Sequence, residues 1–331
     1  MKPDILLIEP MMPAIEAELD AAYQVHRWNG QPLPANSPIR AVVTGGGTGV
    51  PCAVMDSLPA LEVITINGIG TDAVDLVEAA RRDIAVTVTR DVLTDDVADL
   101  GMALMLAAMR DLVPGDRLVR DSLWGKQGLP LARKVSGAKL GIVGMGQVGQ
   151  AIARRARAFS MDVAYFSRRD LALDGVPFHA SLIDLASWSD VLVIAASGGA
   201  QSRHLISRDV IDALGPDGLL VNVARGSVVD EEALVAALVE GRLGRAALDV
   251  FTDEPNVPDT LKTLDNVVLQ PHRASATLET RTAMGQLVLD NLAAHFAGRP
   301  LLTPVITVDT PKSAAQAKAA SRAGVPEPAS S

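Results

Sequence analysis

The chain has 331 residues, of which 48% are hydrophobic, 21% charged and 3% aromatic, which excludes a disordered or fibrous protein and allows two globular domains. Its 30 Lys and Arg against 39 Asp and Glu give a net charge of −9, which disfavours binding to nucleic acid or to anionic membrane surfaces. The single cysteine, Cys52, cannot form an internal disulfide, so we expect a cytoplasmic protein. We also expect no secretion signal or membrane span, because the most apolar helical segment, residues 100–109, is too short.

Short apolar runs alternate with segments of helical period almost throughout, which predicts an α/β protein with parallel sheets covered by helices on both faces. In the first third, we predict one helix at 73–81 and strands at 5–8, 41–44, 63–66 and 85–88. A long helix at 94–109 then marks the crossing to a second domain. Because this helix is apolar nearly all round, we expect it to be buried inside the molecule or against a second subunit.

A second αβ series is predicted over residues 139–270, followed by a last helix at 277–296 that ends before Gly298. From residue 308 to 331 the sequence is rich in Ala, Ser, Pro and Lys without an apolar period. We therefore expect a flexible tail there.

A glycine fingerprint indicates dinucleotide binding in the second series. The predicted strand 140–143 leads directly into Gly144-Met145-Gly146-Gln147-Val148-Gly149, which opens a helix. Gly144 permits the tight turn, Gly146 lets the backbone approach a pyrophosphate, and Gly149 lets the helix pack on the strand. The helix N-terminus offers free N–H groups to the anion, so we predict that these residues, with Gln147 and Val148, bind the cofactor.

The residues after the next strand favour NADPH over NADH. This strand, at 163–166, ends in Ser167-Arg168-Arg169, whereas an NAD site needs a carboxylate here for the ribose 2′-hydroxyl. Arginines and a hydroxyl suit a 2′-phosphate. The alternative is that one or both arginines only face solvent, and NADH then remains possible.

A glycine cluster at 45–49 resembles this fingerprint but lacks its spacing, and Pro51 removes a further backbone donor. We interpret it as a sharp loop at the sheet edge, or else as part of the lining of a ligand cleft.

Three apolar runs, at 218–224, 246–251 and 267–271, each lead to a chemically capable side chain: Arg225, Glu254 and His272. The carboxyl ends of parallel strands share one edge of a sheet, so these side chains can converge beside the cofactor. An imidazolium at His272 could protonate the oxygen of a reduced carbonyl, Glu254 could favour the charged ring, and Arg225 could hold a carboxylate. The trio predicts reduction of a small 2-oxo acid, although Arg225 could instead cap the sheet edge and Glu254 could form a surface ion pair.

The acidic run Asp230-Glu231-Glu232 is interpreted as the N-cap and first turn of a helix rather than a metal site. We predict no metal.

The chain resembles the D-isomer-specific 2-hydroxyacid dehydrogenases over residues 1–307, and most closely the NADPH-dependent glyoxylate/hydroxypyruvate reductases and the hydroxyphenylpyruvate reductases. The resemblance is carried, in chain order, by residues 91–99, the fingerprint 144–149, and the motifs 221–226, 229–231, 248–255 and 271–272.

This resemblance implies two Rossmann-like domains with a cleft between them, and a homodimer built mainly on the cofactor domain. The substrate domain would comprise residues 1–93 and 287–307, and the dinucleotide domain residues 94–286. Arg225, Glu254 and His272 would be catalytic, with Thr94 and Asp249 as further cofactor contacts. The loop Asn67-Gly68-Ile69-Gly70 would hold the substrate carboxylate through backbone N–H groups, chiefly those of Ile69 and Gly70.

The sequence departs from this family at two places. Arg273 follows the catalytic histidine where relatives usually have a hydrophobic residue, and it could face outward or serve a second anionic group on the substrate. The loop after the predicted strand 191–194 lacks the Pro-Leu-Thr-Pro-like segment common in relatives, and Ser197 is its candidate cofactor contact.

Two other functions stay open. A dinucleotide-sensing interaction protein without catalysis would keep the same trio, and turnover of 2-oxo acids would exclude it. Formate oxidation is disfavoured, because Glu254 stands where that branch of the family pairs its histidine with Gln.

Overall fold

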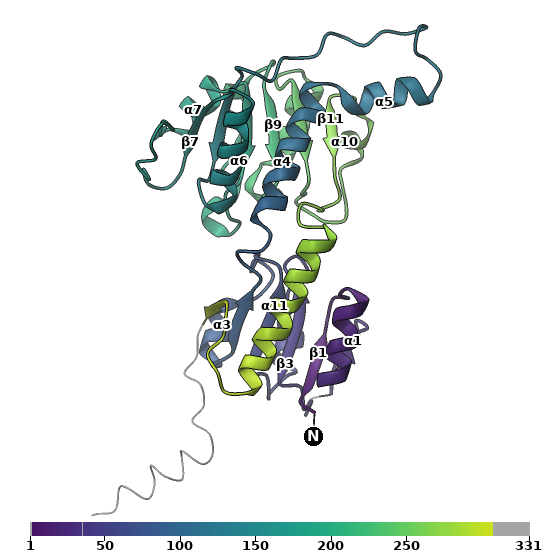
Figure 1. Cartoon of the computed structure of the whole chain (residues 1–331), viewed down its shortest axis with the longest axis vertical. Coiled ribbons are helices and arrows are strands. Elements are labelled where there is room, and N and C mark those ends of the chain that lie inside the picture. The colour runs from purple at the N-terminus through teal and green to yellow at the C-terminus, as the bar shows by residue number, and fades with distance from the viewer. Residues whose placement is uncertain (1, 35, 307–331) are drawn as a thin grey trace, which may run out of the picture. The chain divides into compact units, whose positions relative to one another are not determined.

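The computed structural model describes residues 2–34 and 36–306, so the tail predicted at 308–331 lies outside the described residues. The chain divides into two compact units (Figure 1). Unit 1 contains the described residues up to Val92 and from Arg281 onward, and unit 2 is Leu93–Thr280. The sequence places the corresponding boundaries at 93/94 and 286/287.

Unit 1 is a six-stranded sheet in the order β12-β5-β4-β3-β1-β2. All neighbouring strands are parallel except β12, which runs antiparallel to β5 at one edge. Its elements are β1 Asp4–Leu7, α1 Pro13–Ala22, β2 Gln24–Arg27, β3 Ala41–Gly45, α2 Cys52–Asp56, β4 Val63–Asn67, α3 Leu76–Arg81, β5 Ala85–Val88, most of α11 Leu278–Phe296, and β12 Pro304–Ile306.

Alternate residues of these strands fill two separate cores. Leu6, Val42 and Ile64 pack with α2 and α3 on one face of the sheet. Their chain neighbours, such as Ile5 and Val63, pack with α1 and α11 on the other face. The apolar runs are continuous because both faces of a helix-covered parallel sheet are buried.

Unit 2 is a second six-stranded sheet, entirely parallel, in the order β11-β10-β9-β8-β6-β7. Its elements are α4 Thr94–Met109, α5 Leu112–Arg120, β6 Lys139–Val143, α6 Gln147–Ala158, β7 Asp162–Phe166, α7 Leu182–Trp188, β8 Val191–Ile194, the 3-10 helix η1 Ala200–Ser202, α8 Arg208–Leu214, β9 Leu219–Asn222, the 3-10 helix η2 Gly226–Val228, α9 Glu231–Val239, β10 Arg245–Leu248, α10 Asp259–Thr263 and β11 Val267–Leu269. The predicted α/β class with two doubly wound parallel-sheet units is confirmed.

The strand order of unit 2 reverses at β6, with β8 on one side and β7 on the other. In open parallel sheets, ligands bind beyond the carboxyl ends of the strands at such a reversal. Every predicted site residue of unit 2 except Thr94 lies in a loop after a carboxyl end of this sheet or at the start of the helix that follows.

Candidate functional site

The turn between β6 and α6 has the geometry needed for a dinucleotide. Gly144 has a φ of +94°, and a Cβ there would lie 2.6 Å from the backbone of Ala196. A Cβ on Gly149 would lie 2.1 Å from the carbonyl oxygen of Gly144. Gly146 differs, because a Cβ there would meet nothing within 4 Å among the described residues. The first two glycines are thus required by packing, while Gly146 leaves open space that a pyrophosphate could occupy.

The N-terminus of α6 is available to an anion. Gly146 is the N-cap and provides no side-chain hydrogen bond, and Gln147 beside it is exposed. Thr94 lies next to this turn, since its hydroxyl donates to Oε1 of Gln147 at 3.2 Å. Two of the predicted cofactor contacts therefore come together, although Thr94 belongs to α4.

The loop after β7 presents cations and has no carboxylate at the strand end. Arg168 and Arg169 are exposed, and Nη1 of Arg168 donates to Oε1 of Gln201 at 3.4 Å. The nearest acid in the sequence, Asp170, accepts from the hydroxyl of Tyr165 at 2.7 Å and from the backbone N of Ala172 at 2.8 Å. Because Asp170 is used to shape its own loop, the charge at the strand end is positive.

Ser197, in the loop after β8, is exposed. Its carbonyl oxygen accepts from the hydroxyl of Ser202 at 2.7 Å, and this bond helps to close the compact loop that carries Gln201. The structure therefore places the predicted contact Ser197 in the same loop as the partner of Arg168.

Arg225, Glu254 and His272 follow β9, β10 and β11, which are adjacent strands. Nδ1 of His272 lies 2.7 Å from Oε2 of Glu254, and the other oxygen of Glu254 accepts from the backbone N of Phe251 at 3.0 Å. The side chains of His272 and Glu254 remain 39% and 31% exposed, so a small ligand can reach the pair. The structure brings together the histidine and the acid that the sequence places at this edge of the sheet.

The pKa of Glu254 reflects this environment. Burial raises the pKa, but the hydrogen bonds from His272 and from Phe251 N, together with the charges of His272 and Arg225, lower it by more. The net result is a pKa below the ordinary value of 4.5. Glu254 is therefore a carboxylate at neutral pH, and Arg225 is close enough to contribute to its charge state.

The turn that carries Arg225 is held by Asn222, a buried residue that sequence reasoning missed. Its side-chain Nδ2 donates to the carbonyl oxygen of Arg225 at 3.0 Å, and its Oδ1 accepts from the N of Ala224 at 3.0 Å. A Cβ on Gly226 would lie 1.9 Å from the backbone of Phe251, so the Arg225 turn packs directly on the turn that holds Glu254. A polar residue ending an apolar strand was the available signal for Asn222.

Asp249 is fully buried beneath His272. Its two carboxylate oxygens accept from the backbone N of Arg273 at 2.7 Å and of Ala274 at 3.0 Å. Its own carbonyl oxygen accepts from the N of His272 at 2.8 Å. Burial raises the pKa of Asp249, and the two backbone hydrogen bonds oppose that change. Asp249, predicted as a cofactor contact, thus holds the loop of His272 in place. The side chain of Arg273 in this loop is exposed.

In unit 1, the loop 67–70 lies at the carboxyl edge of the sheet, because Asn67 is the last residue of β4. The carbonyl oxygen of Gly68 accepts from the N of Thr89 at 2.8 Å. A Cβ on Gly46 would lie 3.3 Å from the carbonyl oxygen of Gly70, so the glycine cluster packs against this loop. Within residues 2–34 and 36–306, the buried oxygens Asn67 Oδ1 and Thr89 Oγ1 have no hydrogen-bond partner, as expected beside a site for a polar ligand.

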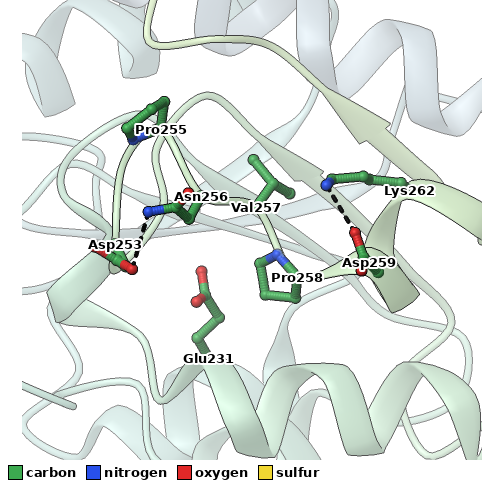
Figure 2. A pocket seen from close by; sticks show the side chains of 8 residues that line it. All are labelled: Glu231, Asp253, Pro255, Asn256, Val257, Pro258, Asp259 and Lys262. Carbon is green, nitrogen blue, oxygen red and sulfur yellow. Dashed lines mark hydrogen bonds and ion pairs between the residues drawn. The ribbon is translucent and has the colours of Figure 1, made fainter.

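The acidic run at 230–232 behaves as predicted. Asp230 is the N-cap of α9, and its carboxylate accepts from the N of Ala233 at 3.1 Å. Glu231 lines a cavity next to the Glu254 turn, together with Asp253, Pro255, Asn256, Val257, Pro258, Asp259 and Lys262 (Figure 2).

The described part of the chain contains no group of three His, Cys, Asp or Glu side chains placed to hold a metal ion. No helix there is long and apolar enough to cross a bilayer.

The chain is similar to known proteins over most of its length. Residues 102–274 match the family described as "D-isomer specific 2-hydroxyacid dehydrogenase, NAD binding domain". The chain is 50% identical over 307 residues to 2-ketogluconate reductase of Gluconobacter oxydans, covering 92% of this chain and 99% of that protein. It is 46% identical over 309 residues to hydroxyphenylpyruvate reductase of Plectranthus scutellarioides, covering 91% and 98%.

Among solved structures, the chain is similar to the NADPH-dependent glyoxylate/hydroxypyruvate reductase of Sinorhizobium meliloti in complex with NADP and malonate. The TM-score is 0.86 at 38% sequence identity, covering 94% of this chain and 98% of that one.

Proposed function

Since the chain belongs to the D-isomer specific 2-hydroxyacid dehydrogenases, a family of oxidoreductases, we propose that it reduces a small 2-oxo acid to the D-2-hydroxy acid with NADPH. In this proposal unit 2 binds the dinucleotide and unit 1 contributes the loop 67–70 to substrate binding. The observation that carries the proposal is the 2.7 Å contact between His272 Nδ1 and Glu254 Oε2.

The contact supports a role for one particular nitrogen of His272. Because Nδ1 is held by Glu254, Nε2 is the nitrogen that donates a proton to the carbonyl oxygen of the substrate. Glu254 keeps the ring oriented and stabilises its charged form. Arg225 binds the substrate carboxylate through its planar guanidinium group, and NADPH supplies the hydride.

The candidate substrates are glyoxylate, hydroxypyruvate and an aryl-pyruvate, and the similarity to 2-ketogluconate reductase adds 2-ketogluconate. The test is a panel of these acids, each with NADPH and with NADH, followed by absorbance at 340 nm. We expect NADPH consumption with at least one acid. Cofactor binding without turnover of any 2-oxo acid would favour a dinucleotide-sensing interaction protein instead.

The preference for NADPH rests on Arg168 and Ser167 at the end of β7, where an NAD site needs a carboxylate. Arg168→Asp should raise the KM for NADPH at least about tenfold and lower the KM for NADH, because it exchanges a partner of the 2′-phosphate for a partner of the 2′-hydroxyl. Arg208→Asp makes the same charge reversal at an exposed arginine on α8 and serves as the control. An unchanged ratio of NADPH to NADH activity in Arg168→Asp would contradict the assignment.

We further propose that the protein is a homodimer in the cytoplasm. The free, exposed Cys52 is compatible with a reducing compartment. Exposed apolar side chains on α5 and in the segment after it support the dimer.

A further inference from the structure

Two carboxylates share the turn that follows β10. The backbone N of Phe251 donates to Glu254 Oε1 at 3.0 Å, and the N of Thr252 donates to Glu231 Oε2 at 3.2 Å. Because these two N–H groups belong to consecutive residues, the turn holds both acids side by side. Glu254 comes from the turn itself, whereas Glu231 comes from the first residue of α9. The proposed reaction uses only Glu254, so Glu231 is a second acid at the active site without an assigned task.

The surroundings of Glu231 are mostly acidic. In Figure 2 its side chain points from α9 toward the loop that carries Asp253 and Asn256. Lys262 is the single cation among the eight residues that line this cavity, and its ammonium group donates to Asp259 at 2.8 Å. On its own helix, Glu231 has the acids Asp230 and Glu232 as neighbours.

Glu254 in turn interacts with charged groups of the reaction. His272 binds Glu254 directly, Arg225 acts on its charge, and Asp249 holds the loop of His272 and Arg273. The negative charge of Glu231 is thus bound by the same turn as a carboxylate that itself pairs with the histidine.

The pKa values of Glu231 and Glu254 are shifted in opposite directions. Burial raises the pKa of Glu231; the hydrogen bond from Thr252 N opposes this, and the charges of Asp253 and Glu254 add to it. The pKa of Glu254 is lowered by its partners in spite of burial. On acidification, Glu231 therefore takes up a proton before Glu254 does, and the acid that faces His272 stays charged.

We propose that Glu231 is a positioning residue for the proton donor. It holds the turn that presents Glu254, and its charge near Glu254 favours the protonated form of the His272 imidazole. The inference rests on the proposed function, in which His272 must be protonated for the carbonyl to be reduced. It follows that the charge of Glu231 extends the reductase activity to higher pH.

The test uses Glu231→Gln, which keeps an oxygen to accept from Thr252 N but removes the charge. In a pH profile of kcat/KM, the midpoint at which activity falls should move to lower pH by roughly half a unit, as expected for one charge several ångströms away in a partly solvated site. The control is Glu232→Gln, which removes the same charge from the next residue of α9, where the side chain is exposed. Its profile should coincide with that of the wild type.

A second variant tests the holding role. Glu231→Ala also removes the acceptor for Thr252 N, so its kcat at the optimal pH should be roughly tenfold below that of Glu231→Gln. Equal kcat values for the two variants would show that Glu231 does not hold the turn.

An NMR titration of the histidine rings in the cofactor-free protein measures the same charge effect without turnover. The signal of His272 is assigned by its loss in His272→Ala, and its midpoint should move to lower pH in Glu231→Gln but not in Glu232→Gln. A titration that coincides with the wild type would overturn the inference. If the shift is seen but no 2-oxo acid is reduced, the proposed function fails while the charge effect of Glu231 on His272 stands.

Discussion

His272 has a left-handed backbone conformation, with a φ of +50°, which is uncommon for any residue other than glycine. Such a conformation persists only where neighbouring groups fix it. Here Asp249 does so, because its carbonyl oxygen binds the N of His272 and its carboxylate binds the next two N–H groups. The buried acid therefore determines the direction in which the imidazole leaves the loop.

At the residue scale, Glu254 should make the stability depend on pH. Its pKa in the folded protein lies below the ordinary value of 4.5, so its favourable contribution is present above about pH 4.5 and is lost as the pH falls through the lowered pKa. Chemical denaturation of wild type and Glu254→Gln should give a difference in free energy of unfolding that shrinks as the pH falls below about 4.5. A difference that stays constant over this range would contradict the lowered pKa.

Sequence reasoning could find the reactive residues but not their supports. Arg225, Glu254 and His272 were predictable because each follows an apolar strand, and parallel strands end at one edge. The contact of Glu231 with the N of Thr252 depends on how the start of α9 packs against the turn after β10. That packing has no signature in residue spacing.

At the scale of elements, the glycines in the turn between β6 and α6 serve two different purposes, packing and ligand binding. Gly149 is needed for the strand and helix to approach each other, and Gly144 is needed for the turn to pack against the loop after β8. Gly146 is needed only if something else must approach the backbone, since a Cβ there meets nothing within 4 Å among the described residues.

This difference makes a matched pair of variants. Gly149→Ala should lower the free energy of unfolding by about 1–3 kcal/mol, because its Cβ would lie 2.1 Å from the carbonyl oxygen of Gly144. Gly146→Ala should leave stability nearly unchanged but weaken NADPH binding at least about tenfold, because the methyl group occupies the space of the pyrophosphate. Thermal melts and fluorescence titration with NADPH measure the two effects. Tight NADPH binding by Gly146→Ala would show that the cofactor does not use this turn.

The periodicity of the sequence did not predict the two edge strands of the unit 1 sheet. The first and last strands of the unit 1 sheet, β2 and β12, have the sequences Gln-Val-His-Arg and Pro-Val-Ile. A strand at an edge can carry polar residues or a proline, because one of its sides has no strand to pair with. Such strands therefore lack the continuous apolar runs that predicted the central strands.

At the scale of the whole molecule, the apolar surface is concentrated in one segment, residues 112–131. It contains six of the fourteen large hydrophobic side chains that are exposed in the described residues, including Trp124 at 78% and Leu131 at 98%. Helix α5, which begins this segment, has no buried residue, and it projects from the rest of unit 2 in Figure 1. The long helix α4 before it is buried along much of its length, and Leu100 and Ala103 on its remaining face are partly or fully exposed.

We expect this 112–131 segment to be the surface on which a second copy packs, since monomers rarely leave so much apolar surface exposed. Sedimentation equilibrium should give twice the chain mass of 34.7 kDa for the wild type. Val119→Asp combined with Trp124→Asp should shift the protein toward the monomer. Val77→Asp, a change at a valine on α3 of unit 1 that is more exposed than Val119, serves as the control and should leave the mass unchanged. A monomeric wild type would refute the homodimer.

The central claim is that His272 donates the proton when a 2-oxo acid is reduced, and it is tested most directly by His272→Ala. With the best acid of the panel, the variant should consume NADPH at least about a hundredfold more slowly than the wild type, as expected for the loss of a general acid. Its Kd for NADPH, measured by fluorescence, should be unchanged. A variant that retained full reductase activity would contradict the account.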